Sequence, residues 1–210
     1  MPKRKTFVVL LHYPIVNKHG EEVVTSVTNL DIHDIARSCK TYGVSRYFIV
    51  NPEPEQERLV GQIIGHWREE ISKIWHPARA RALALCQFCR SFEEAYNEAD
   101  RLNREDHPGA KAPFVVMPDA RELKGVDPWS YAELREKLAS GRLGPDDDGF
   151  RPLMVVYGTG WGISESFFPK VDRVLRPLRA LPNPINDESR YNHLSVRAAA
   201  AIVLDRLFGQ

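Results

Sequence analysis

Residues 153–164 read LMVVYGTGWGIS, an apolar run followed by three glycines at alternate positions, Gly158, Gly160 and Gly162. The spacing excludes the G-x-G-x-x-G dinucleotide loop, the lysine-containing P-loop and the nucleophile elbow. In an open α/β sheet, ligands bind outside the carboxyl ends of the strands, where this loop would lie. Glycine there permits left-handed backbone and close approach of a ligand. The stretch therefore predicts a ligand-binding loop, with a plain tight turn as the alternative.

Outward from this stretch, short apolar runs rich in β-branched residues alternate with segments of helical period. The alternation is typical of an α/β fold with a mostly parallel sheet flanked by helices, and the chain offers six strands for it. The strands are expected at residues 6–13, 47–50, 82–87, 113–117, 153–157 and 171–178. The helices are expected at residues 31–42, 54–67, 92–103, 131–139 and 194–208.

The composition fits a globular domain of 210 residues, with 43% hydrophobic and 27% charged residues. The net charge of +1 gives no global signature of a nucleic-acid-binding or membrane-surface protein, so an anionic partner must meet a local patch. No apolar run reaches the roughly 20 residues needed to cross a bilayer, and we expect no membrane association. Three cysteines are too few for a disulfide framework, which favours a cytoplasmic location.

Cys86 and Cys89 form a C-x-x-C pair at the end of an expected strand. A three-residue offset in a strand places them on opposite faces, and no second Cys/His pair has the spacing of a zinc site. We therefore predict no bound metal.

Two further segments contain candidate functional residues. Residues 67–81 interleave arginine and lysine with tryptophan and histidine, a mixture that can contact phosphate and stack on unpaired bases. The alternative is a solvated face with its aromatic rings in the core. In residues 29–44, Asp31 is expected to cap an amphipathic helix whose Ile32 and Ile35 face inward while Arg37 emerges near the end of the first strand. A capped helix explains most of that segment.

The last expected helix carries apolar and alanine positions around more than one face, from Val196 to Leu204. A helix packed only against one sheet needs fewer of them, so this helix predicts a homodimer. Before it, residues 179–190 contain Pro182 and Pro184 and exclude regular structure.

Taken in order, four segments resemble the SPOUT superfamily, knotted α/β methyltransferases that use S-adenosylmethionine (SAM) to modify RNA. Residues 31–44 resemble the first motif, 118–121 a cofactor loop, 156–164 the second motif and 191–200 the third. The strings NLDIHDIAR at 29–37 and YNHLSVR at 191–197 are similar to a bacterial group of RNA methyltransferase domains related to tRNA (guanine-N1) methyltransferase. The resemblance implies a homodimer and one domain over residues 1–210, with a carboxyl-terminal trefoil knot that binds the cofactor over roughly residues 112–210.

The resemblance also implies a site for SAM, which leaves as S-adenosylhomocysteine, and an RNA substrate, a tRNA or an rRNA. Arg37 would lower the pKa of the nucleophile or hold a phosphate, and Asp187 or Glu188 would accept the proton. Ribose methylases of the superfamily have Asn where Asp31 stands and another near His193, so 2′-O chemistry does not follow from the motifs. The implied cofactor residues are Met117, Pro118, Asp119, Tyr157, Gly158, Thr159, Gly160, Trp161, Gly162, Leu178, Tyr191, Asn192, His193 and Leu194.

Two other functions fit the same residues. One is a non-catalytic RNA- or nucleotide-binding protein on the same knotted fold. The other is an ordinary doubly wound nucleotide enzyme with an unknotted chain, whose ligand would sit where the strand order reverses. Binding of SAM separates the enzyme from the first of these.

Overall fold

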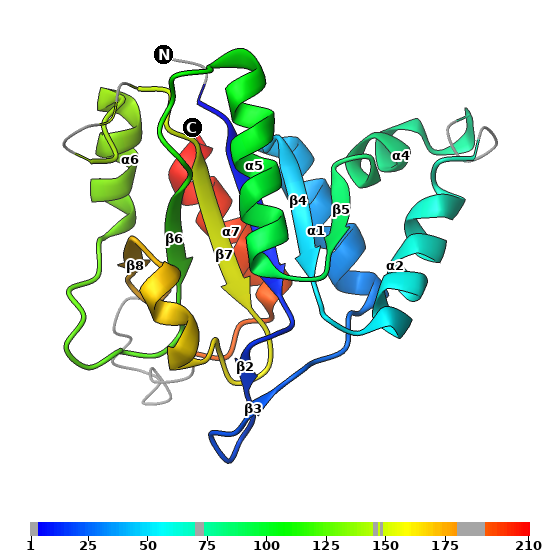
Figure 1. The fold of residues 1–210 in the computed structure, drawn as a ribbon, viewed down its shortest axis with the longest axis horizontal. Helices are drawn as coiled ribbons and strands as arrows, with labels where there is room; N and C mark the ends of the chain where they lie inside the picture. Colours follow the sequence, from blue (N-terminus) through cyan, green and yellow to red (C-terminus); the bar gives the residue numbers. More distant parts are fainter. Residues whose placement is uncertain (1–3, 70–73, 145–146, 148, 180–191) are drawn as a thin grey trace, which may run out of the picture.

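The computed structural model describes residues 4–69, 74–144, 147, 149–179 and 192–210. Its centre is a six-stranded sheet with the order β5-β4-β1-β7-β6-β8, in which all neighbouring strands are parallel (Figure 1). The strands are β1 (Thr6–Leu11), β4 (Arg46–Val50), β5 (Cys86–Cys89), β6 (Phe114–Pro118), β7 (Leu153–Gly158) and β8 (Arg173–Leu175). The predicted fold class of a parallel six-stranded α/β sheet is confirmed, and the knot stays a prediction.

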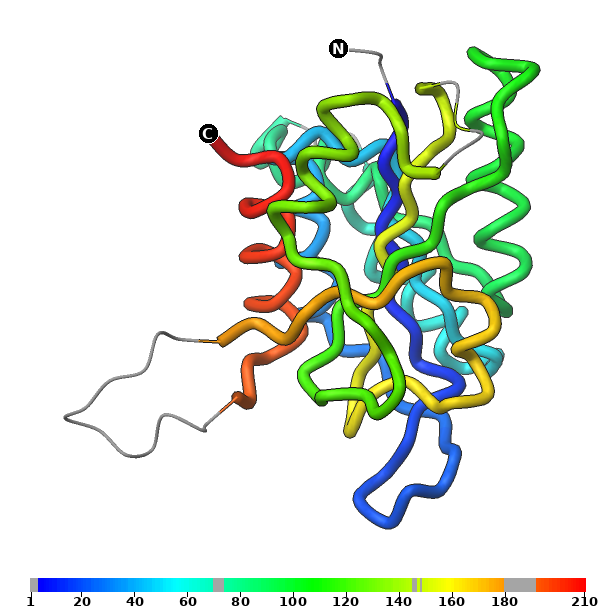
Figure 2. The backbone as a smooth tube through the Cα atoms, turned by 90° about the vertical axis from the view of Figure 1, so that its left-hand side faces the viewer, coloured from blue at the N-terminus to red at the C-terminus, as the bar shows by residue number. Residues whose placement is uncertain are grey.

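Helices bury both faces of the sheet. One face is covered by α1 (Asn29–Thr41), α2 (Pro54–His66), α4 (Pro77–Leu83), α6 (Tyr131–Ser140) and α7 (Val196–Phe208). The other is covered by α5 (Phe92–Asp106) and the short 3-10 helix η1 (Glu165–Lys170). Figure 2 shows α7 and α5 on opposite sides of the sheet.

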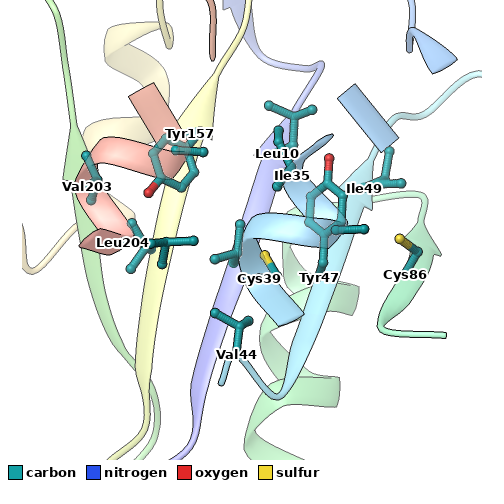
Figure 3. Packing of buried hydrophobic residues seen from close by; sticks show 14 of the residues in the cluster. Leu10, Ile35, Cys39, Val44, Tyr47, Ile49, Cys86, Tyr157, Val203 and Leu204 are labelled. Atoms are coloured by element: carbon teal, nitrogen blue, oxygen red, sulfur yellow. The ribbon is translucent and has the colours of Figure 1, made fainter. Parts of the chain in front are cut away.

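The strand sequences follow from this double coverage. In β1, Val8 and Leu10 point into the first core while Phe7, Val9 and Leu11 point into the second, and all five are fully buried. Figure 3 shows the first core, in which Ile35 and Cys39 of α1 pack beside Leu10. Burial on both faces explains why the strands read as continuous apolar runs rather than as alternating ones.

The C-x-x-C pair divides between the two cores as predicted. Cys86 belongs to the first core and Cys89 to the second. Burial raises the pKa of each of the two thiols to about 12, so both stay protonated at neutral pH.

Three expected boundaries are wrong. The strand expected at residues 82–87 begins only at Cys86, because Ala82 and Leu83 end α4. Pro77 starts that helix and alanine, arginine and leucine continue it, all good helix formers. The strand expected at 171–178 is only three residues long, since residues 165–170 form η1 and Pro177 follows closely. The first strand ends at Leu11, before a cis Tyr13-Pro14 bond.

The start of α1 also differs from expectation. Thr28, not Asp31, is its N-cap, and the Thr28 side chain accepts a hydrogen bond from the backbone N–H of Asp31. Asp31 lies in the first turn, where its carboxylate accepts a hydrogen bond from the Thr28 hydroxyl at 2.6 Å. A threonine three residues before the expected start provides the β-branched hydroxyl cap instead.

A small hairpin lies beyond the end of β1 and was not expected. It consists of β2 (Ile15–Val16) and β3 (Glu22–Val23), which pair antiparallel. Its strands have two residues each, too short for an alternating pattern to be visible. Among the described residues, none of the helices combines the length and apolar character that crossing a membrane requires.

Candidate functional site

Three of the predicted cofactor segments meet at the carboxyl edge of β6 and β7. The Asn192 side-chain amide donates to the carbonyl of Ala120 at 3.0 Å, which joins the segment before α7 to the loop after β6. Arg121 Nη2 donates to the carbonyl of Ile163 at 2.9 Å, which joins the same loop to the one after β7. Parallel neighbours end at the same edge, so loops distant in sequence converge there (Figure 1).

Arg121 holds this edge together. Its Nε and Nη2 donate to the two carboxylate oxygens of Asp119 at 2.9 and 2.7 Å, and the Asp119 side chain is only 5% exposed. This pairing with Asp119 raises the pKa of Arg121. Bidentate geometry fixes the guanidinium plane as well as its charge. The loop sequence PDAR contained this residue, but only the tertiary contact with Ile163 identifies its role.

The glycines after β7 make room for protein atoms. A Cβ at Gly160, whose φ is +55°, would lie 2.9 Å from Cγ2 of Ile15 in the hairpin. A Cβ at Gly162, whose φ is +108°, would lie 2.7 Å from the Arg121 guanidinium. The loop is also tied to the hairpin by hydrogen bonds from Val16 N–H to the Gly162 carbonyl and from Trp161 N–H to the Val16 carbonyl. The predicted left-handed backbone is confirmed at Gly160 and Gly162.

The remaining predicted cofactor residues differ in exposure. The side chain of Met117 lies in the second core and that of Tyr157 lies in the first, where Figure 3 shows it, so only their backbone faces the edge. Trp161 and Leu194 are 63% and 48% exposed. A cavity of about 390 Å³ adjoins the edge, lined by residues of the segments 121–128 and 174–179, directly beside Leu178. Tyr191, Asp187 and Glu188 lie outside the described residues.

A buried histidine links β1 to the glycine loop. His12 follows β1, is fully buried, and its Nδ1 lies 3.0 Å from Oγ1 of Thr25. The Thr25 hydroxyl lies 2.5 Å from that of Thr159. Burial lowers the pKa of His12 to about 4, against the opposing effect of the Asp31 charge, so the ring is neutral at pH 7. The position of His12 directly after a strand is the one feature of the sequence that points to its link with the glycine loop.

The starts of α1 and α7 are joined by an ion pair. Arg197 Nη1 lies 3.1 Å from Oδ1 of Asp31, and Arg197 Nε lies 3.6 Å from Oδ2 of Asp34. The segments that resemble the first and third motifs are therefore neighbours in space. Asp31 is 5% exposed, so this pair is poorly screened by solvent.

Arg37 lies elsewhere, in a second cavity of about 620 Å³ between α1, α2 and α4. It is exposed and stands about 9 Å along the α1 axis from Asp31, given ~1.5 Å per residue. The cavity also contains Trp67 and Arg79, so the two segments that the sequence treated separately share one site. In the described part of the chain, neither a hydrogen bond nor an ion pair joins Arg37 to the loops of the carboxyl edge. Across the same residues, three or more His, Cys, Asp or Glu side chains do not gather as a metal site would require.

The fold and the edge define an α/β protein in which loops after adjacent parallel strands converge. Residues 5–209 match the family described as SAM-dependent RNA methyltransferase, and the chain belongs to that family. The assignment made from the motifs, including the cofactor SAM, is thereby confirmed.

Relatives extend over nearly the whole chain. A tRNA (guanine-N(1)-)-methyltransferase of Oleidesulfovibrio alaskensis is 33% identical over 208 residues, which cover 99% of this chain and 43% of the relative. An uncharacterized protein of Aquifex aeolicus is 30% identical over 210 residues, covering 100% of this chain and 91% of the relative. This chain thus spans less than half the length of the relatives named as tRNA methyltransferases.

Solved structures share the fold at low identity. A probable methylase family protein from Haemophilus influenzae has a TM-score of 0.55 and 17% identity, covering 97% of this chain and 63% of the other. The SpoU methyltransferase AviRb from Streptomyces viridochromogenes, solved with the cofactor AdoMet, has a TM-score of 0.50 and 12% identity, covering 99% of this chain and 58% of the other. The likeness to SPOUT methyltransferases is confirmed at the level of the fold.

Proposed function

We propose that this protein transfers a methyl group from SAM to a nucleotide of a structured RNA, a tRNA or an rRNA. The observation that carries the proposal is the convergence of residues 117–121, 158–163 and Asn192 at one edge of the sheet, in a member of this family. The name of the 33% identical relative supports a tRNA as the first substrate to test.

The carboxyl edge fits SAM. The backbone of residues 158–162 offers donors and acceptors for the adenine edge, and the cavity beside Leu178 combines apolar walls with Arg121. The residues that would hold the cofactor are Met117, Pro118, Asp119, Tyr157, Gly158, Thr159, Gly160, Trp161, Gly162, Leu178, Tyr191, Asn192, His193 and Leu194. SAM supplies an electrophilic methyl group when bound.

The protein's own task is to align a nucleophile of the RNA and remove its proton. Arg37 keeps its charge at any physiological pH and presents a rigid fork of donors, so it stabilises a developing oxyanion or clamps a phosphate. Asp187 or Glu188 accepts the proton. Both acids precede α7 in the sequence, and Asn192, also before α7, bonds to the carboxyl edge.

The protein is proposed to act as a homodimer through α7. One stripe of α7 is buried, and Ala198, Ala201 and Ile202 on its other sides remain partly exposed. Small side chains permit close approach of a second helix, and the partner would complete each site. Light scattering should give about 48 kDa, twice the 24.0 kDa chain. A monomer at micromolar concentration would exclude a shared site.

The cytoplasm is the proposed location. All three cysteines are unpaired and buried, which suits a reducing compartment.

Two measurements test the proposed function. Calorimetry with SAM and S-adenosylhomocysteine should show micromolar binding, and labelled methyl groups should appear in tRNA or rRNA lacking the modification. Mass spectrometry of the nucleosides then identifies the methylated atom. Absence of SAM binding would favour the non-catalytic RNA- or nucleotide-binding protein on the same fold.

A further inference from the structure

The cavity between α1, α2 and α4 is separate from the carboxyl edge of β6 and β7. It lies beside β4 and β5, at the other end of the sheet order (Figure 1). Its volume of about 620 Å³ exceeds that of the cavity beside Leu178. Two arginines, two histidines, a tryptophan and two exposed leucines are among its walls, which suits a ligand with both a charged and a flat apolar part.

Among the described residues, neither Arg37 nor Arg79 has a carboxylate as an ion-pair partner. Their guanidinium groups make neither a hydrogen bond nor an ion pair with any residue that the structure describes. By contrast, Arg101 and Arg104 on α5 pair with acids of their own helix at 2.5–2.7 Å. Arg37 and Arg79 line one cavity without an ion-pair partner among the described residues, and two guanidinium groups in that state suit an anion.

Trp67 orders one of these arginines. The Arg79 guanidinium lies over the Trp67 ring, 5.1 Å from its centroid, while His33 and His66 meet the ring edge-on at 5.5 and 5.4 Å. Trp67 itself packs against the first core and is held in place by it. A guanidinium held over a fixed ring presents its outer face as a platform for a further planar group.

The electrostatics of the cavity are positive. Among the described residues that line it, the one acid is Asp34. Oδ2 of Asp34 lies 3.6 Å from Nε of Arg197, so Arg197 partly neutralises this carboxylate. Desolvation lowers the pKa of His33, and the charges of Arg79 and Arg37 lower it further, although Asp34 opposes them. Leu30 and Leu59 are 58% and 38% exposed and supply the apolar part of the wall.

We infer that this cavity binds an unpaired nucleotide of the RNA, whose phosphate contacts Arg37 and whose base stacks on Arg79 over Trp67. The inference rests on the proposed function, since that function provides the RNA. A base offers a planar face for stacking, and the adjoining phosphate offers a negative charge. One nucleotide therefore matches both the stacking platform and the positive charge of the cavity.

Fluorescence anisotropy with a labelled single-stranded oligoribonucleotide tests this site. Arg79→Ala should weaken binding roughly tenfold, within the range for one lost stacking contact, and should lower the salt slope by about one. Arg79→Lys keeps the charge but not the planar group, so it should restore the salt slope and not the affinity. Arg101→Ala on α5 is the matched control and should bind RNA like the wild type. All three variants should bind SAM normally.

The inference is overturned if Arg79→Ala binds RNA as tightly as Arg101→Ala while the wild type binds it well. Failure of the proposed function has a different signature, because the wild type itself would then bind no SAM or transfer no methyl group. Thermal melting of each variant checks that it folds, and because Arg79 is exposed we expect unchanged melting.

Discussion

The carboxyl edge of β6 and β7 differs from the cavity between α1, α2 and α4 in whether its charged groups have partners. At the edge, Arg121 is paired with Asp119, and Nδ1 of His12 reaches Thr159 through Thr25. In the cavity, Arg37 and Arg79 are exposed and form no ion pair within the described part of the chain. The hydrogen bonds of the edge form without a ligand. In the cavity, a bound anion would neutralise the charges of Arg37 and Arg79.

The difference sets how each region discriminates. A preorganised edge selects by shape and backbone hydrogen bonds, so small steric changes there have large effects. A cationic cavity attracts by charge, and its affinity falls as salt rises. The predictions below test this contrast, from the largest effect to the smallest.

Gly160→Val should abolish binding of SAM. A side chain at this position meets Ile15 at 2.9 Å and strains a backbone with φ of +55°, so the loop must move away from the hairpin. The sheet should remain folded, as circular dichroism can show. Calorimetry that finds unchanged affinity would place the cofactor elsewhere.

Arg37→Ala should reduce methyl transfer by roughly 10²-fold, the usual scale for a lost transition-state contact. Affinity for SAM should change little, because Arg37 belongs to the cavity and not to the edge. Single-turnover rates on the identified RNA measure the effect. Full activity would make Arg37 a surface residue and direct the search for catalytic groups to Asp187, Glu188 and Arg197.

Acid should destabilise the protein through His12. The unfolded chain binds a proton at this ring near pH 6.5, but the folded chain does so only near pH 4. The unfolded state therefore holds more protons in that window, and stability falls as pH is lowered through it, by roughly 3 kcal/mol. Denaturant unfolding of wild type and His12→Gln should show a steeper pH dependence for the wild type. Equal slopes would contradict the assignment.

Gly61→Ala should raise the free energy of unfolding by about 0.5–1 kcal/mol. Gly61 lies within α2, and a Cβ there meets open space, in contrast to Gly160. Cofactor affinity should stay unchanged, which makes the variant a control for Gly160→Val. A loss of stability would mean that α2 needs this glycine for packing.

Local pattern alone determined the fold class. Continuous apolar runs predicted buried parallel strands, and helical period located five of the helices, because both signals are carried by neighbouring residues. The inward positions Ile32, Ile35, Ala36 and Cys39 of α1 follow from the same period and are all fully buried. The pattern predicted Asp31 as the cap of this helix, whereas the structure has Thr28 there. The motifs supplied the family and the cofactor.

Only the tertiary structure decided which residues share a site. Arg121 and Ile163 are 42 positions apart, and Thr25 and Thr159 are 134 apart, yet each pair is in hydrogen-bonding contact at the carboxyl edge. Likewise, Arg37 and Arg79 line the same cavity because α1 and α4 pack on the same face of the sheet. Periodicity reports how each segment faces a core, but it carries no information about which segments become neighbours. That depends on strand order and helix packing, which are set by long-range contacts.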